Sequence, residues 1–230
     1  MNLNTSKISL NKKIATVGVL GALTVLLGIT PLGFIRLPWG LAITLLHIPT
    51  IIGTLIAGWP VGIGIGAVFG ILSMIQAASN PVGLDACFVN PLVSILPRLL
   101  LAPTAAILFK SLCKIKKIPK PISATITALI TTLLHTIYVS FALYLFANSQ
   151  MHTIMDGNGL GAFILILLPN AIAEAIAAGI ITGGVIGILY ATSEKKSKLS
   201  FEEEATESSV NSNSTDDTAS SMIKNDSTRN

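Results

Sequence analysis

The sequence predicts an all-α membrane protein with six transmembrane helices and with both its N and C termini in the cytoplasm. Of its 230 residues, 51% are hydrophobic and 11% are charged, whereas about a quarter of the residues in a soluble domain are charged. Residues 14–109 contain three charged side chains, those of Arg36, Asp85 and Arg98. Most acidic residues follow Ser193. The chain up to about that point therefore forms one membrane block.

Six apolar runs define the expected helices, because about 20 apolar residues cross a hydrocarbon core of about 30 Å. The runs are residues 14–35, 41–57, 61–78, 88–109, 122–146 and 160–190. The first run, of about 22 residues, is longer than the apolar part of a signal peptide, so we expect a retained helix. Gly58, Trp59 and Pro60 separate the second run from the third. Since proline interrupts a regular helix, we expect a tight hairpin there.

The lysines orient this block, because cytoplasmic loops of membrane proteins carry an excess of basic residues. They lie beside the apolar runs, so they indicate membrane orientation and not nucleic-acid binding. With six spans the lysines share one face, and the opposite face has Arg36 as its single basic residue together with Asp85 and Asp156. Trp39 and Trp59 are typical of anchors at the outer and inner interfaces, with a pocket lid as the alternative for Trp39. The three groups are Lys7, Lys12 and Lys13, then Lys110, Lys114, Lys116, Lys117 and Lys120, then Lys195, Lys196 and Lys198.

We divide the chain into a cytoplasmic N-terminus at residues 1–13, a membrane domain at residues 14–191 and a cytoplasmic tail at residues 192–230. The tail is rich in Ser, Thr, Asn, Asp and Glu, and such a composition buries too little apolar surface to fold. We expect a disordered tail, with a regulatory role as the alternative. Cys87 and Cys113 have no metal-binding spacing, and we expect no disulfide to Cys113 on the cytoplasmic side.

Small residues recur at every fourth position in two of the runs, which lets neighbouring helices approach closely. We favour packing within the protein as their role, with docking against another membrane protein as the alternative. The first helix carries a shorter version, Gly18 and Ala22, and is a candidate partner-facing helix. The two longer series are Gly58, Gly62, Gly66 and Gly70, and Ala171, Ala175, Gly179, Gly183 and Gly187.

Several polar residues lie inside the apolar runs at similar depth, and such residues are functional candidates. Arg98 is ten residues into the fourth run, which places it about 15 Å from the outer face. Pro91 and Pro97 free backbone groups in the same run. Together these residues predict an outward-facing polar pocket. Its candidate substrate-binding residues are Arg98 and Asn90, His135 and Tyr138, Asn170 and Glu174, and His47.

Arg98 has two interpretations that do not exclude each other. It forms a structural ion pair with Glu174, or its planar guanidinium binds a substrate carboxylate or phosphate. His135 and His47 are either hydrogen-bonded structural residues or ligand contacts.

Motifs for several enzyme chemistries are missing. The sequence has no Walker-type phosphate loop, no His-Glu-x-x-His zinc motif and no paired acidic motif for phosphoryl transfer. We therefore expect no catalytic residues, cofactor or metal ion, and a small-molecule binding and transport protein. A self-contained facilitator and a membrane enzyme using His135 and Glu174 as acid and base are the alternatives. Uptake without ATPase partners would favour the former, and turnover of a bound compound the latter.

Four segments resemble the second, third and fourth helices of substrate-binding S components of energy-coupling factor (ECF) transporters. The similarity extends over about residues 10–191, and the Asn-Pro…Pro-Arg segment is its most specific part. The segments are residues 47–53 (HIPTIIG), 58–62 (GWPVG), 66–70 (GAVFG) and 90–98 (NPLVSILPR).

The resemblance implies a six-helix S component in the bacterial plasma membrane that binds one vitamin or related micronutrient on its outer side. It implies no ATP hydrolysis by this chain, and as partners a transmembrane coupling protein and two cytosolic ATPases. Many members dock to the coupling protein through Ala-x-x-x-Ala in the first helix, where this chain has Gly18 and Ala22.

The sequence most resembles pantothenate-type members, which implies that Arg98 binds the carboxylate of pantothenate and that Asn90, Asn170 or His135 binds its other polar atoms. Since S components share one fold across different substrates, riboflavin or another vitamin is the alternative. With three Tyr and two Trp in the chain, aromatic stacking of riboflavin is less favoured.

Overall fold

The computed structural model describes residues 9–30, 33–36, 42–79, 83–115, 117–149 and 167–195. The chain divides into two compact units, one of Asn2–Gly187 and one of Ile188–Asn230 with Met1. Of the second unit, the described residues 188–195 form the end of the last helix. The predicted tail beyond residue 195, Trp39 and the predicted helix start at residues 160–166 lie outside the described residues.

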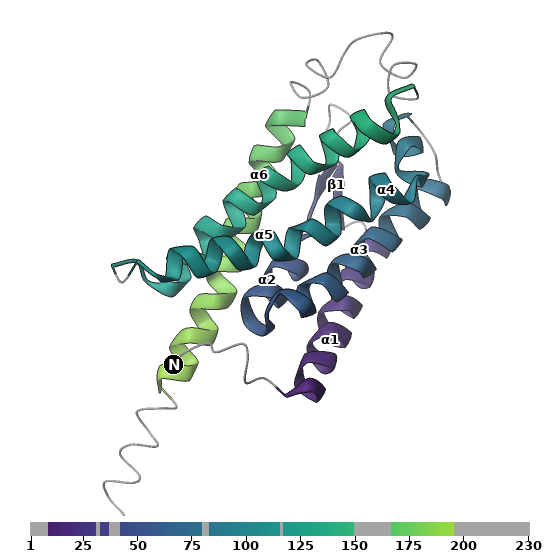
Figure 1. Cartoon of the computed structure of the whole chain (residues 1–230). Coiled ribbons are helices and arrows are strands. Elements are labelled where there is room, and N and C mark those ends of the chain that lie inside the picture. Colours follow the sequence, from purple (N-terminus) through teal and green to yellow (C-terminus); the bar gives the residue numbers. More distant parts are fainter. Residues whose placement is uncertain are drawn as a thin grey trace, which may run out of the picture. The chain divides into compact units, whose positions relative to one another are not determined.

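The described elements are almost entirely helical, which confirms the all-α prediction (Figure 1). A two-stranded antiparallel hairpin, in which Ile35 pairs with Ile43, is the one addition among them. The elements are α1 (Leu10–Ile29), β1 (Phe34–Arg36), β2 (Ala42–Thr44), α2 (Ile48–Ala57), α3 (Trp59–Ser79), the 3-10 helix η3 (Gly83–Val89), α4 (Pro91–Ser94), α5 (Leu96–Cys113), α6 (Lys120–Phe146) and the last helix (Leu167–Lys195).

Five of the described helices are long and apolar enough to cross a membrane: α1, α3, the Pro91–Cys113 segment, α6 and the last helix. The prediction of one membrane helix over residues 41–57 is wrong, because this run divides into β2, a turn and the ten-residue α2. Ten helical residues extend only about 15 Å. Pro49 lies in the first turn of α2, where its fixed φ and missing N–H favour a helix start.

The first predicted helix, residues 14–35, also ends earlier than expected, since α1 stops at Ile29. Thr30 takes an extended conformation, with φ −105° and ψ 153°. This is the conformation that a following proline imposes on the residue before it, and Pro31 follows. The helix therefore ends before Pro31, and the next described strand, β1, begins at Phe34.

The predicted hairpin between the second and third runs is confirmed. Gly58 ends α2 with a φ of 95°, a left-handed conformation that glycine adopts without steric cost. Its backbone N–H donates to the carbonyl of Thr54 at 2.9 Å, and α3 begins at the next residue, Trp59. Trp59 is 53% exposed, which is compatible with an interfacial anchor.

The glycines of the four-residue series in α3, Gly62, Gly66 and Gly70, pack within the protein, against α2 and the α4–α5 segment. A Cβ at Gly66 would lie 2.6 Å from the carbonyl oxygen of Arg98, and one at Gly70 would lie 2.9 Å from Cα of Ile95. Such distances admit no side chain, so α3 and α5 meet backbone to backbone. This close approach brings α3 against the N-terminal half of α5, where Arg98 lies.

The small residues of the last helix have the same role against α6. A Cβ at Gly179 would lie 3.0 Å from Leu129, and Gly183 packs on Thr125. Internal packing, the favoured interpretation of both small-residue series, is therefore confirmed at these positions.

The spatial order of the helices follows from their contacts. Helix α1 packs on α2 and α3, α3 packs on α5, and α5 packs on α6, and Figure 1 shows α5 between α3 and α6. Helix α2 contacts α1, α3, α5 and α6 and is buried over almost its whole length. Ile51 and Leu55 of α2 belong to the largest apolar cluster, which also contains Leu46, Phe69 and Leu101.

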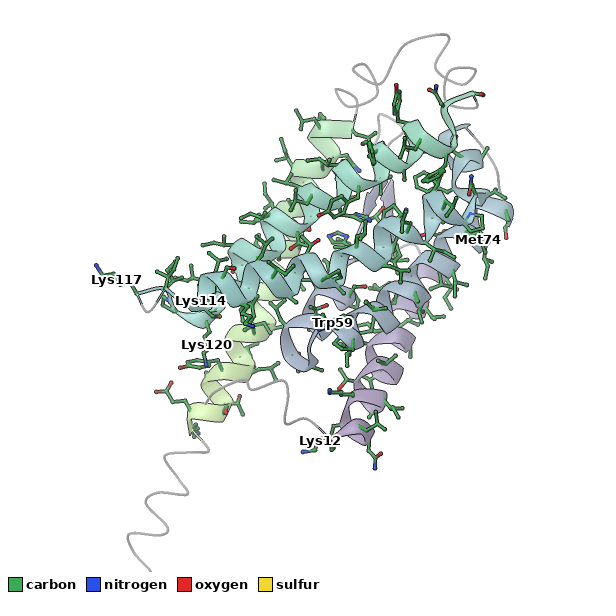
Figure 2. All side chains as sticks on the ribbon, in the orientation of Figure 1. Lys12, Trp59, Met74, Lys114, Lys117 and Lys120 are labelled. Carbon is green, nitrogen blue, oxygen red and sulfur yellow. The ribbon has the colours of Figure 1, made fainter. Side chains whose placement is uncertain are left out.

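Labelled lysines lie toward one end of the Asn2–Gly187 unit. In Figure 2, Lys114, Lys117 and Lys120, from the end of α5 to the start of α6, lie at the left and Lys12 of α1 lies at the bottom, whereas Met74 lies at the right. This arrangement is compatible with the predicted basic face. The cytoplasmic side of that face stays a prediction.

Candidate functional site

The predicted fourth helix, residues 88–109, is interrupted rather than continuous, and the interruption positions Arg98. Pro97 has no N–H to donate to the carbonyl four residues earlier, which belongs to Val93. The Nη1 atom of Arg98 donates to that Val93 oxygen at 2.9 Å. The Pro-Arg sequence therefore creates a free carbonyl and supplies the side chain that binds it.

The guanidinium of Arg98 lies over two aromatic rings. Its Cζ atom is 5.2 Å from the ring centroid of Phe69 in α3 and 5.0 Å from that of Phe88 in η3. Arg98 is 7% exposed. Cation–π contacts with a desolvated guanidinium are worth about 2 kcal/mol or more, so the two rings hold the charge in a fixed plane.

Two histidines lie in the same cluster. The rings of His47 and His135 are nearly parallel, with centroids 6.1 Å apart and an interplanar angle of 21°. The His135 ring is also 6.1 Å from the ring of Phe69. His47 precedes α2 and His135 is in the middle of α6, so packing of α2 against α6 brings them together.

Glu174 and Asn170 are one helical turn apart and form a hydrogen-bonded pair with strand β2. Oε1 of Glu174 accepts from the backbone N–H of Thr44 at 2.6 Å and from Nδ2 of Asn170 at 3.2 Å. Both residues are buried, each at 8% exposure. The last helix thereby holds the strand that leads to His47.

Arg98 and Glu174 interact electrostatically, but among the described residues no ion pair joins them. The carboxylate of Glu174 is directed to the backbone of β2, and the guanidinium of Arg98 to Val93 and the two phenyl rings. The geometry therefore leaves Arg98 without a contacting carboxylate in the described part of the chain.

Asn90 and Tyr138, the other two predicted site residues, make contacts between elements. Asn90 caps α4 by accepting from the N–H of Leu92 at 3.0 Å, and its Nδ2 donates to the carbonyl of Phe146 at 3.3 Å. The Tyr138 hydroxyl is 3.0 Å from that of Thr104 in α5. Asn90 therefore links the start of α4 to the end of α6, and Tyr138 links α6 to α5.

Sequence reasoning did not find Phe69, Phe88 and Thr50. Thr50 lies one turn after His47, and its buried hydroxyl has no hydrogen-bond partner among the described residues. The methyl group of Thr50 and the carbonyl of Arg98 both flank Gly66. Phe69 belongs to the Gly-rich segment 66–70, but its contact with Arg98 comes from the packing of α3 on α5 and has no local signal.

The cluster combines the cation of Arg98 with neutral polar groups, packed against the rings of Phe69 and Phe88. It suits binding of a small anion with polar substituents. Within the described ranges, no group of three or more His, Cys, Asp or Glu side chains is arranged to hold a metal ion. Cys87 and Cys113 are free cysteines.

The sequence matches one family model, described as ECF transporter, substrate-specific component, over residues 12–198. No curated protein matched the sequence. The family match extends over every described helix apart from the first residues of α1. It includes the Arg98 cluster and the small-residue packing of α3 and the last helix. The chain therefore belongs to the family of substrate-specific components of ECF transporters.

Proposed function

We propose that this S component binds pantothenate for an ECF importer and that Arg98 binds the vitamin's carboxylate. Family membership makes the chain a substrate-binding, multi-pass membrane protein and not a catalyst, with ATP hydrolysis in partner subunits. The choice of pantothenate goes further and rests on the chemistry of the Arg98 cluster and on the His-Ile-Pro and Pro-Arg segments.

The state of Arg98 is the observation that supports the proposal most strongly. A buried charge without a paired opposite charge is costly, and its Nε atom is buried without a hydrogen-bond partner in the described part of the chain. A substrate carboxylate supplies both an opposite charge and a two-oxygen acceptor that matches the guanidinium fork. Because Phe69 and Phe88 hold the guanidinium plane, the acceptor geometry is set before binding.

Of the remaining predicted residues, the two histidines fit the uncharged part of the vitamin, which has an amide and two hydroxyls. We assign this part to His47 and His135, beside the ring of Phe69. We assign to Glu174 and Asn170 the positioning of β2, to Asn90 the capping of α4, and to Tyr138 a tie to α5.

The proposed partners are a transmembrane coupling protein and two cytosolic ATPases in a bacterial plasma membrane. The exposed face of α1, which contains Gly18 and Ala22, is the proposed docking surface for the coupling protein. Gly18 and Ala22 are exposed there, and a Cβ built at Gly18 meets no atom within 4 Å.

The test is direct binding of pantothenate to the purified full-length protein, measured by calorimetry beside riboflavin, folate, thiamine and biotin. We expect tight binding of pantothenate alone. Arg98→Ala should weaken it about 100-fold, since hydrogen bonds to a charged group contribute about 1.5–3 kcal/mol. Lys114→Ala, which removes an exposed lysine, is the matched control and should bind as the wild type does.

Tight binding of another vitamin would overturn pantothenate and keep the family assignment. Equal pantothenate affinities of Arg98→Ala and the wild type would overturn the carboxylate contact. Melting temperatures of both variants, measured in the same detergent, distinguish loss of a contact from loss of the fold.

A further inference from the structure

The nitrogens of the imidazole pair, His47 and His135, have few partners within the protein. Nδ1 and Nε2 of His47 and Nε2 of His135 are buried and make no well-formed hydrogen bond among the described residues, although the backbone of Thr44 interacts with the His47 ring. His47 is 1% exposed and His135 7%. Buried polar atoms in native proteins are nearly always hydrogen-bonded, so three such nitrogens on one ring pair indicate a place where polar atoms bind.

The imidazole pair is part of the Arg98 site and not a separate cluster. The ring of Phe69 contacts the ring of His135 and also the guanidinium of Arg98. A molecule whose carboxylate binds Arg98 therefore has its next atoms near the imidazoles.

The side chain of His47 does not cap helix α2. His47 is at the N-cap position of α2, yet its side chain makes no capping hydrogen bond. Its backbone carbonyl accepts from Ile51 as the first helical bond. The backbone of His47 therefore begins α2, and its ring nitrogens take no part in capping that helix.

A neutral imidazole carries one donor and one acceptor, and it is the ordinary form at pH above about 6.5. Hydroxyl and amide groups match this pattern, whereas an alkyl chain leaves the nitrogens unpaired. A site built to hydrogen-bond a substrate group strongly rejects an analogue that lacks it.

We propose that His47 and His135 form a specificity-determining subsite for uncharged hydroxyl or amide groups, so that the substrate class is a carboxylate bearing such groups nearby. This inference rests on the proposed carboxylate contact of Arg98. The proposed subsite identifies the residues that select the neutral part of the substrate. It also excludes simple alkyl carboxylates as substrates.

The experiment uses pantothenate and panthenol, its analogue with an alcohol in place of the carboxylate, on the full-length protein. Phenylalanine keeps the ring volume and removes the nitrogens, so His47→Phe and His135→Phe should each weaken binding of both compounds at least about 10-fold. His47→Gln and His135→Gln, which keep a donor and an acceptor, should stay within about 3-fold of the wild type. Tyr144→Phe, which changes an exposed ring of the same α6, is the matched control.

Arg98→Ala separates the two ends of the site, because it should weaken pantothenate and leave panthenol unchanged. Unchanged pantothenate affinity in both Phe variants would overturn the subsite. The subsite would also be overturned if the Phe variants lost pantothenate binding but kept panthenol binding. The same holds if the wild type did not bind panthenol at millimolar concentration. If the wild type does not bind pantothenate at all, the proposed function fails first and the subsite fails with it.

Discussion

Arg98 obtains its position from its own neighbour in the sequence. Pro97 removes the helical donor to the Val93 carbonyl, and Arg98 replaces it at 2.9 Å. The guanidinium then lies over Phe69 and Phe88. A free-standing arginine has many rotamers, whereas this one is set by a backbone carbonyl and two rings, so less conformational entropy is lost on binding.

Glu174 is the second residue with a defined positioning role, since its carboxylate holds the backbone of Thr44 three residues before His47. Glu174→Ala should free strand β2, lower the melting temperature and weaken pantothenate binding about 10-fold, the loss expected from one buried hydrogen bond to a charged acceptor. Glu174→Gln keeps an acceptor oxygen and should stay close to the wild type in both measurements. Thermal unfolding and calorimetry check this, and equal losses in Ala and Gln variants would contradict it.

At the scale of elements, small residues decide which helix faces are internal. Those of α3 and the last helix are used in packing on α5 and α6, where added side chains would meet backbone or neighbouring groups. Those of α1 are on an exposed face. The same four-residue spacing therefore has different uses, and the difference is visible only once the neighbours of each helix are known.

Gly18→Leu in α1 should weaken assembly with the coupling protein at least about 10-fold while pantothenate affinity stays unchanged, because bulk on this face disturbs only a close helix–helix contact. The matched control is Gly184→Leu in the last helix. Gly184 is also exposed, and a Cβ there likewise meets no atom within 4 Å. Co-purification of the complex measures assembly. Normal assembly of Gly18→Leu would place the docking surface elsewhere.

At the scale of the whole molecule, family membership implies that binding and energy coupling reside in different chains. Among the described residues, the buried ionisable side chains Arg98, His47, His135 and Glu174 interact electrostatically, and the described helices expose many large apolar side chains. Such an exterior suits lipid contact and contact with other membrane helices.

Liposomes that contain this protein alone should bind pantothenate without accumulating it. Liposomes that also contain the coupling protein and the ATPases should accumulate it when ATP is supplied to the ATPase side. Radiolabelled uptake distinguishes the two. Transport by the chain alone, down a pantothenate gradient and without ATP, would instead support the facilitator.

Much of the fold follows from local sequence. Apolar runs predict membrane helices because transfer of such runs into lipid depends on their composition, and the predicted runs at residues 61–78 and 122–146 lie within α3 and α6. The turn at Gly58 was equally predictable from its neighbours. The prediction for residues 41–57 was wrong because composition alone does not distinguish a short strand followed by a short helix from one spanning helix.

The sequence by itself determined that the chain is an all-α membrane protein, which residues are polar inside it, and its resemblance to S components. Tertiary structure alone decided that Phe69 and Phe88 lie against Arg98, that Glu174 bonds to Thr44, and that the two imidazoles meet. The physical reason is the distance along the sequence between the interacting residues. Helix formation and lipid transfer depend on neighbouring residues, whereas these contacts join residues from different helices and from strand β2, and only the close packing of those elements determines them.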